Sequence, residues 1–433
     1  MASKPSPDFN RLLSKIRDVD GVDVELRADD PPFAEFPLDE YRRRYARAVA
    51  LMEDEGLDAL LLSHELNVRY FSGYLTILWV SRFRSMVALL PRDASAGPTL
   101  VAPGQETGNA LGTSWVPDRV LYPDQEPSIP HIAQALRDKG LERGRIGMEL
   151  GFGTRLGMTL QDFEELREAA APAELVDASH LIQAVRMLKS PAEVARIRRA
   201  CEISQKAAQT GFEALHPGMS EKELGAVFGS TMYAEGAELG SWPSFLTVDS
   251  YPGRRQMVNS IASDHRIREG EMILVDGGAT HGGYATDFIR QACLGEPTAD
   301  QRRWFEIAIE ANEAAVDALR PGVTGADVYE AGIRVFEKYG LESYNVLNIV
   351  GHGCGMEVHE LPWLGERGAV YSTDTVLEPG MVFCIEPVIA GMDGPTWDAG
   401  IFIVEDKILL TETGPQVLTT DMPKDLWVQP VHG

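Results

Sequence analysis

The sequence contains an imperfect internal repeat, and this repeat limits most strongly how the chain can fold. The segment ALHPGMS at 214–220 reappears as ALRPGVT at 318–324, and each copy follows a long amphipathic pattern. Further on, EGEMILVD at 269–276 is matched by PGMVFCIE at 379–386. Two copies are too few for a solenoid, which needs about three or more. The repeat therefore predicts one domain of two related halves with pseudo-twofold symmetry, and a site where the halves meet.

Both halves carry acidic residues at the ends of apolar strand patterns. Asp276 and Glu386 end the two matched segments, and Asp287 and Glu405 follow in corresponding places. Carboxylates are rarely buried without a partner. Packed together without cations, these four would repel one another and take up protons. Two divalent cations would balance their charge, so we expect the four acids to bind a metal pair.

Two histidines follow in a glycine-rich segment between these acids. His352 lies in GHGCG at 351–355, and His359 follows seven residues later. Flanking glycines let the backbone approach a ligand, and a histidine in this setting is a candidate for metal binding or proton transfer. One imidazole among oxygen ligands suits Mn, Fe(II), Co or Zn. Four cysteines lack the spacing of a zinc site, and we expect small buried thiols at Cys201, Cys293, Cys354 and Cys384.

Helix and strand signals divide the chain into three parts. Residues 1–36 are polar and rich in Pro and Asp, and we interpret them as an extended N-terminal arm. A helix is expected from Leu38 to about Glu55, and alternating strand and helix patterns then predict an α/β domain over 37–188. Ser190 and Glu193 form a capping box that begins a long helix. The second domain is therefore expected over 189–433.

Charge and hydropathy restrict the partners and the compartment. The 433 residues carry a net charge of −25, which argues against a nucleic-acid or anionic membrane surface. The longest apolar runs fall short of the ~18 residues of a transmembrane helix, and the first residues lack a secretory signal. We therefore expect a cytoplasmic protein without a nucleic-acid or membrane partner, and the charge leaves the substrate open, whether a small peptide or a small molecule.

Taken together, the motifs resemble the signature of the pita-bread metallopeptidases, which include methionine aminopeptidase, aminopeptidase P and prolidase, with creatinase as a relative. The matching segments are DGGATHGGYATD (276–287), GHGCGMEVHELP (351–362), IEP (385–387) and VED (404–406). The stretch 58–73 is similar to the creatinase-type N-terminal domain, which points to the aminopeptidase P, prolidase and creatinase branch. The resemblance implies an α/β N-terminal domain followed by an α+β pita-bread catalytic domain.

The resemblance also implies roles for individual residues. Two divalent metal ions would be bound by five side chains: Asp276, Asp287, His352, Glu386 and Glu405. A hydroxide between the two ions would be the nucleophile. His359 would donate a hydrogen bond or shuttle a proton beside the scissile group, and Glu386 would act as the general base. Family members with this N-terminal domain are commonly homodimers.

Three positions depart from the pattern of aminopeptidase P and prolidase. Asn259 and Asn348 stand where substrate-binding histidines are expected, and Ile403 replaces a usual arginine. Asparagine can still form hydrogen bonds but cannot titrate. The neighbouring loop is either a solvated turn or a site for a substrate carboxylate, and its candidate residues are Tyr251, Arg254 and Arg255.

Three functions are consistent with these residues. The first is a metallopeptidase that removes an N-terminal residue before proline. The second is a non-peptide enzyme of the same superfamily, either a small amide or amidine hydrolase or a lyase of the dimethylsulfoniopropionate type. Retention of all five ligands and of His359 favours hydrolysis, whereas the two asparagines keep the second function open. The third, a non-catalytic pita-bread binding module, is disfavoured because such modules usually lose metal ligands.

Overall fold

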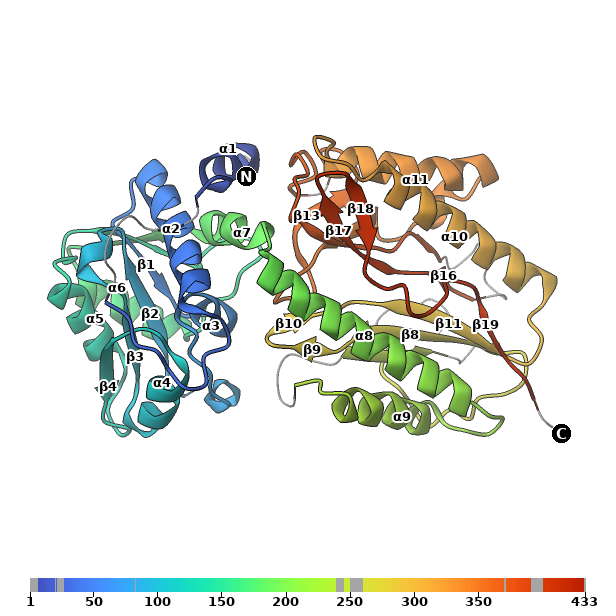
Figure 1. The fold of residues 1–433 in the computed structure, drawn as a ribbon, viewed down its shortest axis with the longest axis horizontal. Helices are drawn as coiled ribbons and strands as arrows, with labels where there is room; N and C mark the ends of the chain where they lie inside the picture. Colours follow the sequence, from blue (N-terminus) through green and yellow to red (C-terminus); the bar gives the residue numbers. More distant parts are fainter. Residues whose placement is uncertain are drawn as a thin grey trace. The chain divides into compact units, whose positions relative to one another are not determined.

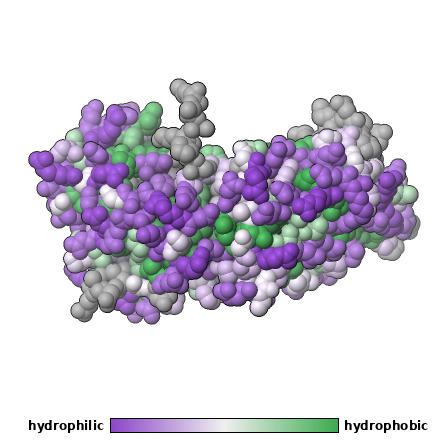
Figure 2. Space-filling view, turned by 90° about the horizontal axis from the view of Figure 1, so that it is seen from above, coloured by the Kyte–Doolittle hydropathy of each residue, from purple (hydrophilic) through white to green (hydrophobic). Residues whose placement is uncertain are grey.

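The computed structural model of the chain contains two compact units, one of residues Pro7–Arg186 and one that includes Met187–Gly433 (Figure 1). It describes residues 7–19, 21, 27–81, 83–238, 245–249, 260–369, 371–390 and 400–431. Within these residues, no helix is both long and apolar enough to cross a membrane. Hydrophilic side chains cover most of the face shown in Figure 2.

The N-terminal unit is built on one six-stranded sheet with the strand order β4-β3-β2-β1-β5-β6. Its strands are β1 (Ala59–Leu62), β2 (Val87–Pro91), β3 (Thr99–Pro103), β4 (Asp118–Tyr122), β5 (Arg145–Met148) and β6 (Glu174–Asp177). Strand β2 runs antiparallel to both neighbours, and the remaining pairs are parallel. The helices are α1 (Phe9–Ile16), α2 (Leu38–Glu55), α3 (Glu65–Ser72), α4 (Thr107–Thr113), α5 (Ile129–Asp138), α6 (Leu160–Ala170) and α7 (Ser179–Met187). The predicted α/β class of this domain is confirmed.

Helix α1 corrects one prediction. Residues 9–16 are helical, so an extended arm is wrong for this stretch. Phe9, Leu12, Leu13 and Ile16 recur at the spacing of one helical face, and all four are buried. An amphipathic stripe of this kind stabilises a helix by burying its apolar side. The polar, Pro-rich residues around it hid the pattern.

Two helix boundaries predicted from local sequence signals are confirmed. Helix α2 ends at Gly56, whose φ of 64° is the left-handed conformation that glycine adopts without strain. Helix α8 (Pro191–Ala214) begins after Ser190, whose side chain accepts a hydrogen bond from the backbone N–H of Glu193. These signals are local, so they could be read without knowing the tertiary fold.

The second unit consists of two similar halves, each a helix pair beside a sheet (Figure 1). In the first half, α8 and α9 (Glu221–Ala234) accompany the sheet β19-β11-β8-β7, whose strands are Trp427–Gln429, Ile289–Leu294, Met272–Gly278 and Phe245–Asp249. In the second half, α10 (Ala299–Ala318) and α11 (Gly325–Tyr339) accompany the sheet β13-β12-β14-β17-β18. Its strands are Glu360–Gly365, Ile349–Gly353, Val382–Ile385, Asp406–Thr411 and Gly414–Val417. This arrangement confirms the predicted pita-bread fold with repeated halves.

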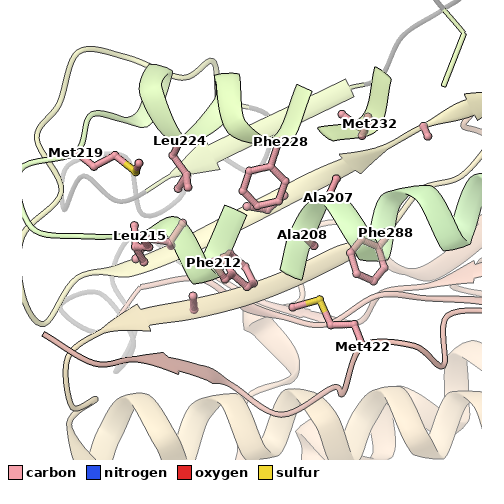
Figure 3. Close-up of a cluster of buried hydrophobic side chains, with 14 of the residues drawn as sticks. Ala207, Ala208, Phe212, Leu215, Met219, Leu224, Phe228, Met232, Phe288 and Met422 are labelled. Atoms are coloured by element: carbon pink, nitrogen blue, oxygen red, sulfur yellow. The ribbon is translucent and has the colours of Figure 1, made fainter. Parts of the chain in front are cut away.

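An apolar core fixes the strands of the first half. Phe212 of α8 and Phe228 of α9 meet edge to face with ring centroids 5.8 Å apart (Figure 3). A side chain at Gly211 would collide with the Phe228 ring, so glycine allows the two helices this close approach. Ile273 and Val275 of β8 belong to the same core. Burial of these residues holds the strand that carries Asp276.

Candidate metal centre

Strands from both halves bring the five predicted ligands to one buried place. Asp276 lies in β8 opposite Ile289 of β11, and His352 lies in β12. The other three flank strands: Asp287 between β10 (Tyr284–Ala285) and β11, Glu386 after β14, and Glu405 between β16 (Phe402–Ile403) and β17. None of the five is more than 7% exposed.

The imidazole of His352 faces the carboxylates. Its Nε2 is 3.2 Å from Glu386 Oε1 and 3.7 Å from Asp287 Oδ2. On the other side of the ring, Nδ1 lies 2.9 Å from the carbonyl oxygen of Gly353. A carbonyl can only accept, so Nδ1 carries a proton and Nε2 is the nitrogen that faces the acids. With Nδ1 protonated, the neutral ring could bind a metal ion through Nε2.

Burial and mutual repulsion disfavour the ionised carboxylates. The pKa of Asp276 is raised well above its ordinary value by desolvation and by the charges of Asp287 and Glu386. Desolvation and the neighbouring acids likewise raise the pKa of Glu405, against the opposing charge of Lys407. Cations placed among these oxygens would remove the repulsion.

Several atoms at this place lack a hydrogen-bond partner within the described part of the chain. They are Asp287 Oδ1, His352 Nε2 and both carboxylate oxygens of Glu405. A buried polar atom left unpaired costs about 1–3 kcal/mol. Oxygen and imidazole donors suit divalent cations such as Mn, Fe(II), Co and Zn. The residues present therefore fit the binding of metal ions.

A thiol and a lysine also reach this centre, and the sequence did not indicate them. Ligand atoms of Asp287, His352, Cys384 and Glu405 lie within 4.8 Å of one another. Cys384 pairs with His352 on one side and with Lys407 on the other, across three adjacent strands. The Lys407 ammonium is buried and donates to Cys384 Sγ at 2.8 Å. Only the strand register places these side chains in one row.

His359 lies beside the ligand histidine. The two imidazole centroids are 4.4 Å apart, and the Trp363 ring packs against both at 5.6 and 5.8 Å. Desolvation and the charge of His352 lower the pKa of His359 to about 4, although the residue keeps exposed surface. A neutral imidazole at the edge of the centre can donate or accept a hydrogen bond. Trp363 was not predicted, because an aromatic residue in a strand usually indicates core.

The predicted substrate residues are only partly described. Asn348 is exposed with a φ of 54° and stands directly before β12. Ile403, at the position of the missing arginine, is buried, and its backbone N–H donates to Gln291 Oε1. The remaining candidates lie outside the described residues: Tyr251, Arg254, Arg255 and Asn259.

Comparisons with known proteins match both units. Residues 195–412 match metallopeptidase family M24, and residues 44–188 match the creatinase/prolidase N-terminal domain. The chain is 30% identical over 382 residues to the Xaa-Pro dipeptidase of Lactobacillus delbrueckii subsp. lactis, covering 88% of this chain and 97% of that protein.

Solved structures give the same result. The prolidase from Pyrococcus horikoshii OT3 superimposes with a TM-score of 0.74 at 27% identity, over 88% of this chain and 99% of that one. The X-Pro aminopeptidase from Thermotoga maritima MSB8 also gives a TM-score of 0.74, at 25% identity, over 89% of this chain and 99% of that one. Both likenesses extend over the two units.

Proposed function

The chain belongs to metallopeptidase family M24, and we propose that it is an Xaa-Pro peptidase with two divalent metal ions. The proposed ligands are Asp276, Asp287, His352, Glu386 and Glu405. The observation that carries this proposal is the convergence of four buried carboxylates and one imidazole, several of whose oxygen and nitrogen atoms have no other described partner. We propose Mn, Fe(II), Co or Zn as the metal, because the donors are mostly oxygen.

Metal ions bound here would lower the pKa of a water molecule and polarise the carbonyl of the scissile bond. Glu386 then acts as the general base, because its carboxylate is buried at the centre and lies beside His352. His359 donates a hydrogen bond from its exposed side to the scissile group. The Trp363 ring next to it offers an apolar face against which a proline ring can pack.

The substrate class is proposed from the relatives together with this local chemistry. One relative is named an Xaa-Pro dipeptidase and another an X-Pro aminopeptidase. We propose that Asn348 and Asn259 bind the substrate by hydrogen bonds. We also propose that three loop residues bind the substrate carboxylate: Tyr251, Arg254 and Arg255. Because asparagine cannot titrate, these two contacts do not add a charge that depends on pH.

A substrate screen tests the proposed function. The metal-loaded full chain is incubated with Xaa-Pro dipeptides, Xaa-Pro tripeptides, small amides and onium compounds. We expect release of the N-terminal amino acid from an Xaa-Pro peptide. Turnover restricted to the amides or onium compounds would instead assign the chain to the non-peptide enzymes of this superfamily.

Replacing His359 by Gln is expected to lower kcat on the order of 10²-fold, because a proton-transfer or hydrogen-bonding group is lost from the reacting centre. KM should change little, since the proposed contacts to substrate ends are elsewhere. Steady-state kinetics and metal content measured on the same sample check this result. A large rise in KM at unchanged kcat would mean that His359 binds substrate and does not assist the reaction.

We further propose that two copies of the chain associate through an apolar patch, defined here as the exposed side chains of Ile77, Val80 and Phe83, which are close in the sequence. These side chains of the N-terminal unit are 74%, 74% and 94% exposed. Large apolar patches on a protein surface commonly mark an interaction site.

The four cysteines are all free and buried, which is consistent with a reducing cytoplasm.

Changing Ile77, Val80 and Phe83 together to Ser is expected to convert a dimer into a monomer, because the buried apolar area is lost. Light scattering coupled to gel filtration measures the mass. Leu160, which is 73% exposed in the same unit, provides the control, and Leu160→Ser should keep the wild-type mass. An unchanged mass in the triple variant would exclude this patch as the interface.

A further inference from the structure

A buried polar network lies behind the two glutamate ligands and uses no ligand atom. Four side chains form it: Arg290 of β11, Asn312 of α10, Asp406 of β17 and Lys424. Asn312 and Asp406 are fully buried and Arg290 is 1% exposed. Buried polar groups of this kind are costly unless fully paired. We therefore ask what each of these four buried side chains contributes to the neighbouring metal centre.

The Asn312 amide connects the two stretches of backbone that carry Glu386 and Glu405. Its Nδ2 donates to the carbonyl oxygen of Ile385 at 2.7 Å and to that of Val404 at 3.3 Å. These two residues immediately precede Glu386 and Glu405. One amide group thus joins the end of β14 to the main chain between β16 and β17, at the residue before each ligand.

Lys424 sets the orientation of that amide. Its Nζ donates to Asn312 Oδ1 at 2.8 Å, so the amide oxygen faces the ammonium and the NH₂ group faces the two carbonyls. An amide with three such partners can adopt only one orientation. Lys424 also pairs with Asp406 Oδ2 at 2.9 Å.

Arg290 completes the network on the other side of Glu405. Its Nη1 donates to the Glu405 carbonyl at 2.7 Å, and its Nη2 donates to Asp406 Oδ1 at 2.8 Å. The guanidinium also lies over the ring of Phe288, next to Asp287, at 4.6 Å. Glu405 is therefore held through the carbonyl before it by Asn312 and through its own carbonyl by Arg290.

We propose that Asn312 is a positioning residue that sets the separation of Glu386 and Glu405 and thereby the affinity of the metal centre. This role rests on the proposed function, because it assumes that both glutamates bind metal. Groups that orient metal ligands typically contribute about 10–100-fold to metal affinity. Asn312 does so through the backbone, since it contacts neither carboxylate.

The test compares Asn312→Asp with the matched variant Gln301→Glu. Both convert a buried amide of α10 into an acid of nearly the same shape. Asn312→Asp loses the donor to the two carbonyls, each directly before a ligand, whereas Gln301→Glu loses a donor to the carbonyl of Gly270, which lies outside β8 and is not adjacent to a ligand. Calorimetric titration with Mn²⁺, the melting temperature and kinetics with an Xaa-Pro peptide are measured for each.

We expect Asn312→Asp to weaken Mn²⁺ binding about 10–100-fold, to lower kcat with little change in KM, and to regain activity at high Mn²⁺. Gln301→Glu should lower only the melting temperature. If Asn312→Asp fails to fold, Lys424→Met decides in the same way, because Lys424 is partly exposed and its loss removes the partner of the Asn312 amide oxygen.

Two outcomes overturn the inference, and they can be distinguished. Wild-type Mn²⁺ affinity in Asn312→Asp, or in Lys424→Met if Asn312→Asp does not fold, would exclude the positioning role and leave the proposed function intact. Failure of the wild-type chain to bind any of Mn²⁺, Fe²⁺, Co²⁺ and Zn²⁺, or binding unchanged by Asp276→Asn, would overturn the proposed function and this role with it.

Discussion

Replacing Asp276 by Asn is expected to reduce kcat/KM on the order of 10³-fold, because it removes one negative ligand while keeping the size of the side chain. Loss of a properly held cation removes several kcal/mol of stabilisation from the transition state, and each 1.4 kcal/mol or so corresponds to about tenfold in rate. Chromatography at saturating metal measures the release of the N-terminal amino acid from an Xaa-Pro peptide and so gives kcat/KM.

Asp264→Asn is the matched control for this variant. Asp264 lies in the same unit but is exposed and pairs with Lys222 at the surface. The same change of acid to amide there should leave kcat/KM within about twofold of wild type, since surface ion pairs contribute little. Equal effects of the two substitutions would contradict the assignment of Asp276 to the metal centre.

Removing the metal is expected to lower the melting temperature of the catalytic unit by roughly 5–10 °C for each ion that was present at about 100 times its dissociation constant. Such a ligand contributes about 2.7 kcal/mol, and in a unit of this size each kcal/mol shifts the transition by about 2–4 °C. Calorimetry with and without a chelator measures the shift. A transition that does not respond to the chelator would contradict metal binding by the folded chain.

The size of this shift should also depend on pH. The pKa values of Asp276 and Glu405 are raised by burial and by their neighbours. In the unfolded chain these carboxyl groups have a pKa of about 4. As the pH rises above this value, the unfolded chain loses their protons more readily than the metal-free folded chain does. The free energy of unfolding of the metal-free chain therefore falls. Added Mn²⁺ relieves that penalty, and its stabilising effect should therefore be larger near about pH 8 than near about pH 5.

The sequence predicted the fold wherever the signal was local or repeated. Gly56 and the Ser190 capping box gave helix limits because the residues that end and begin helices lie next to them in the chain. The two related halves followed from the spacing of matched segments. Helix α1 was missed because four apolar residues were scattered among polar ones.

Side chains that depend on strand register could not be predicted. Cys384 comes next to His352, and Lys407 next to Cys384, only because β12, β14 and β17 pair in one particular register. Asn312 looked like an ordinary polar residue of an amphipathic helix, and its importance appears only when its amide is seen between two strands. Trp363 was likewise indistinguishable from a core aromatic residue.

The metal content of the purified chain tests the central claim most directly. After dialysis against Mn²⁺ and removal of free ion, elemental analysis gives the number of ions per chain for the wild type and for Asp276→Asn. We predict two ions per wild-type chain and fewer in the variant. A wild-type chain that retains no ion, or a variant that retains as many as the wild type, would contradict a metal pair held by Asp276, Asp287, His352, Glu386 and Glu405.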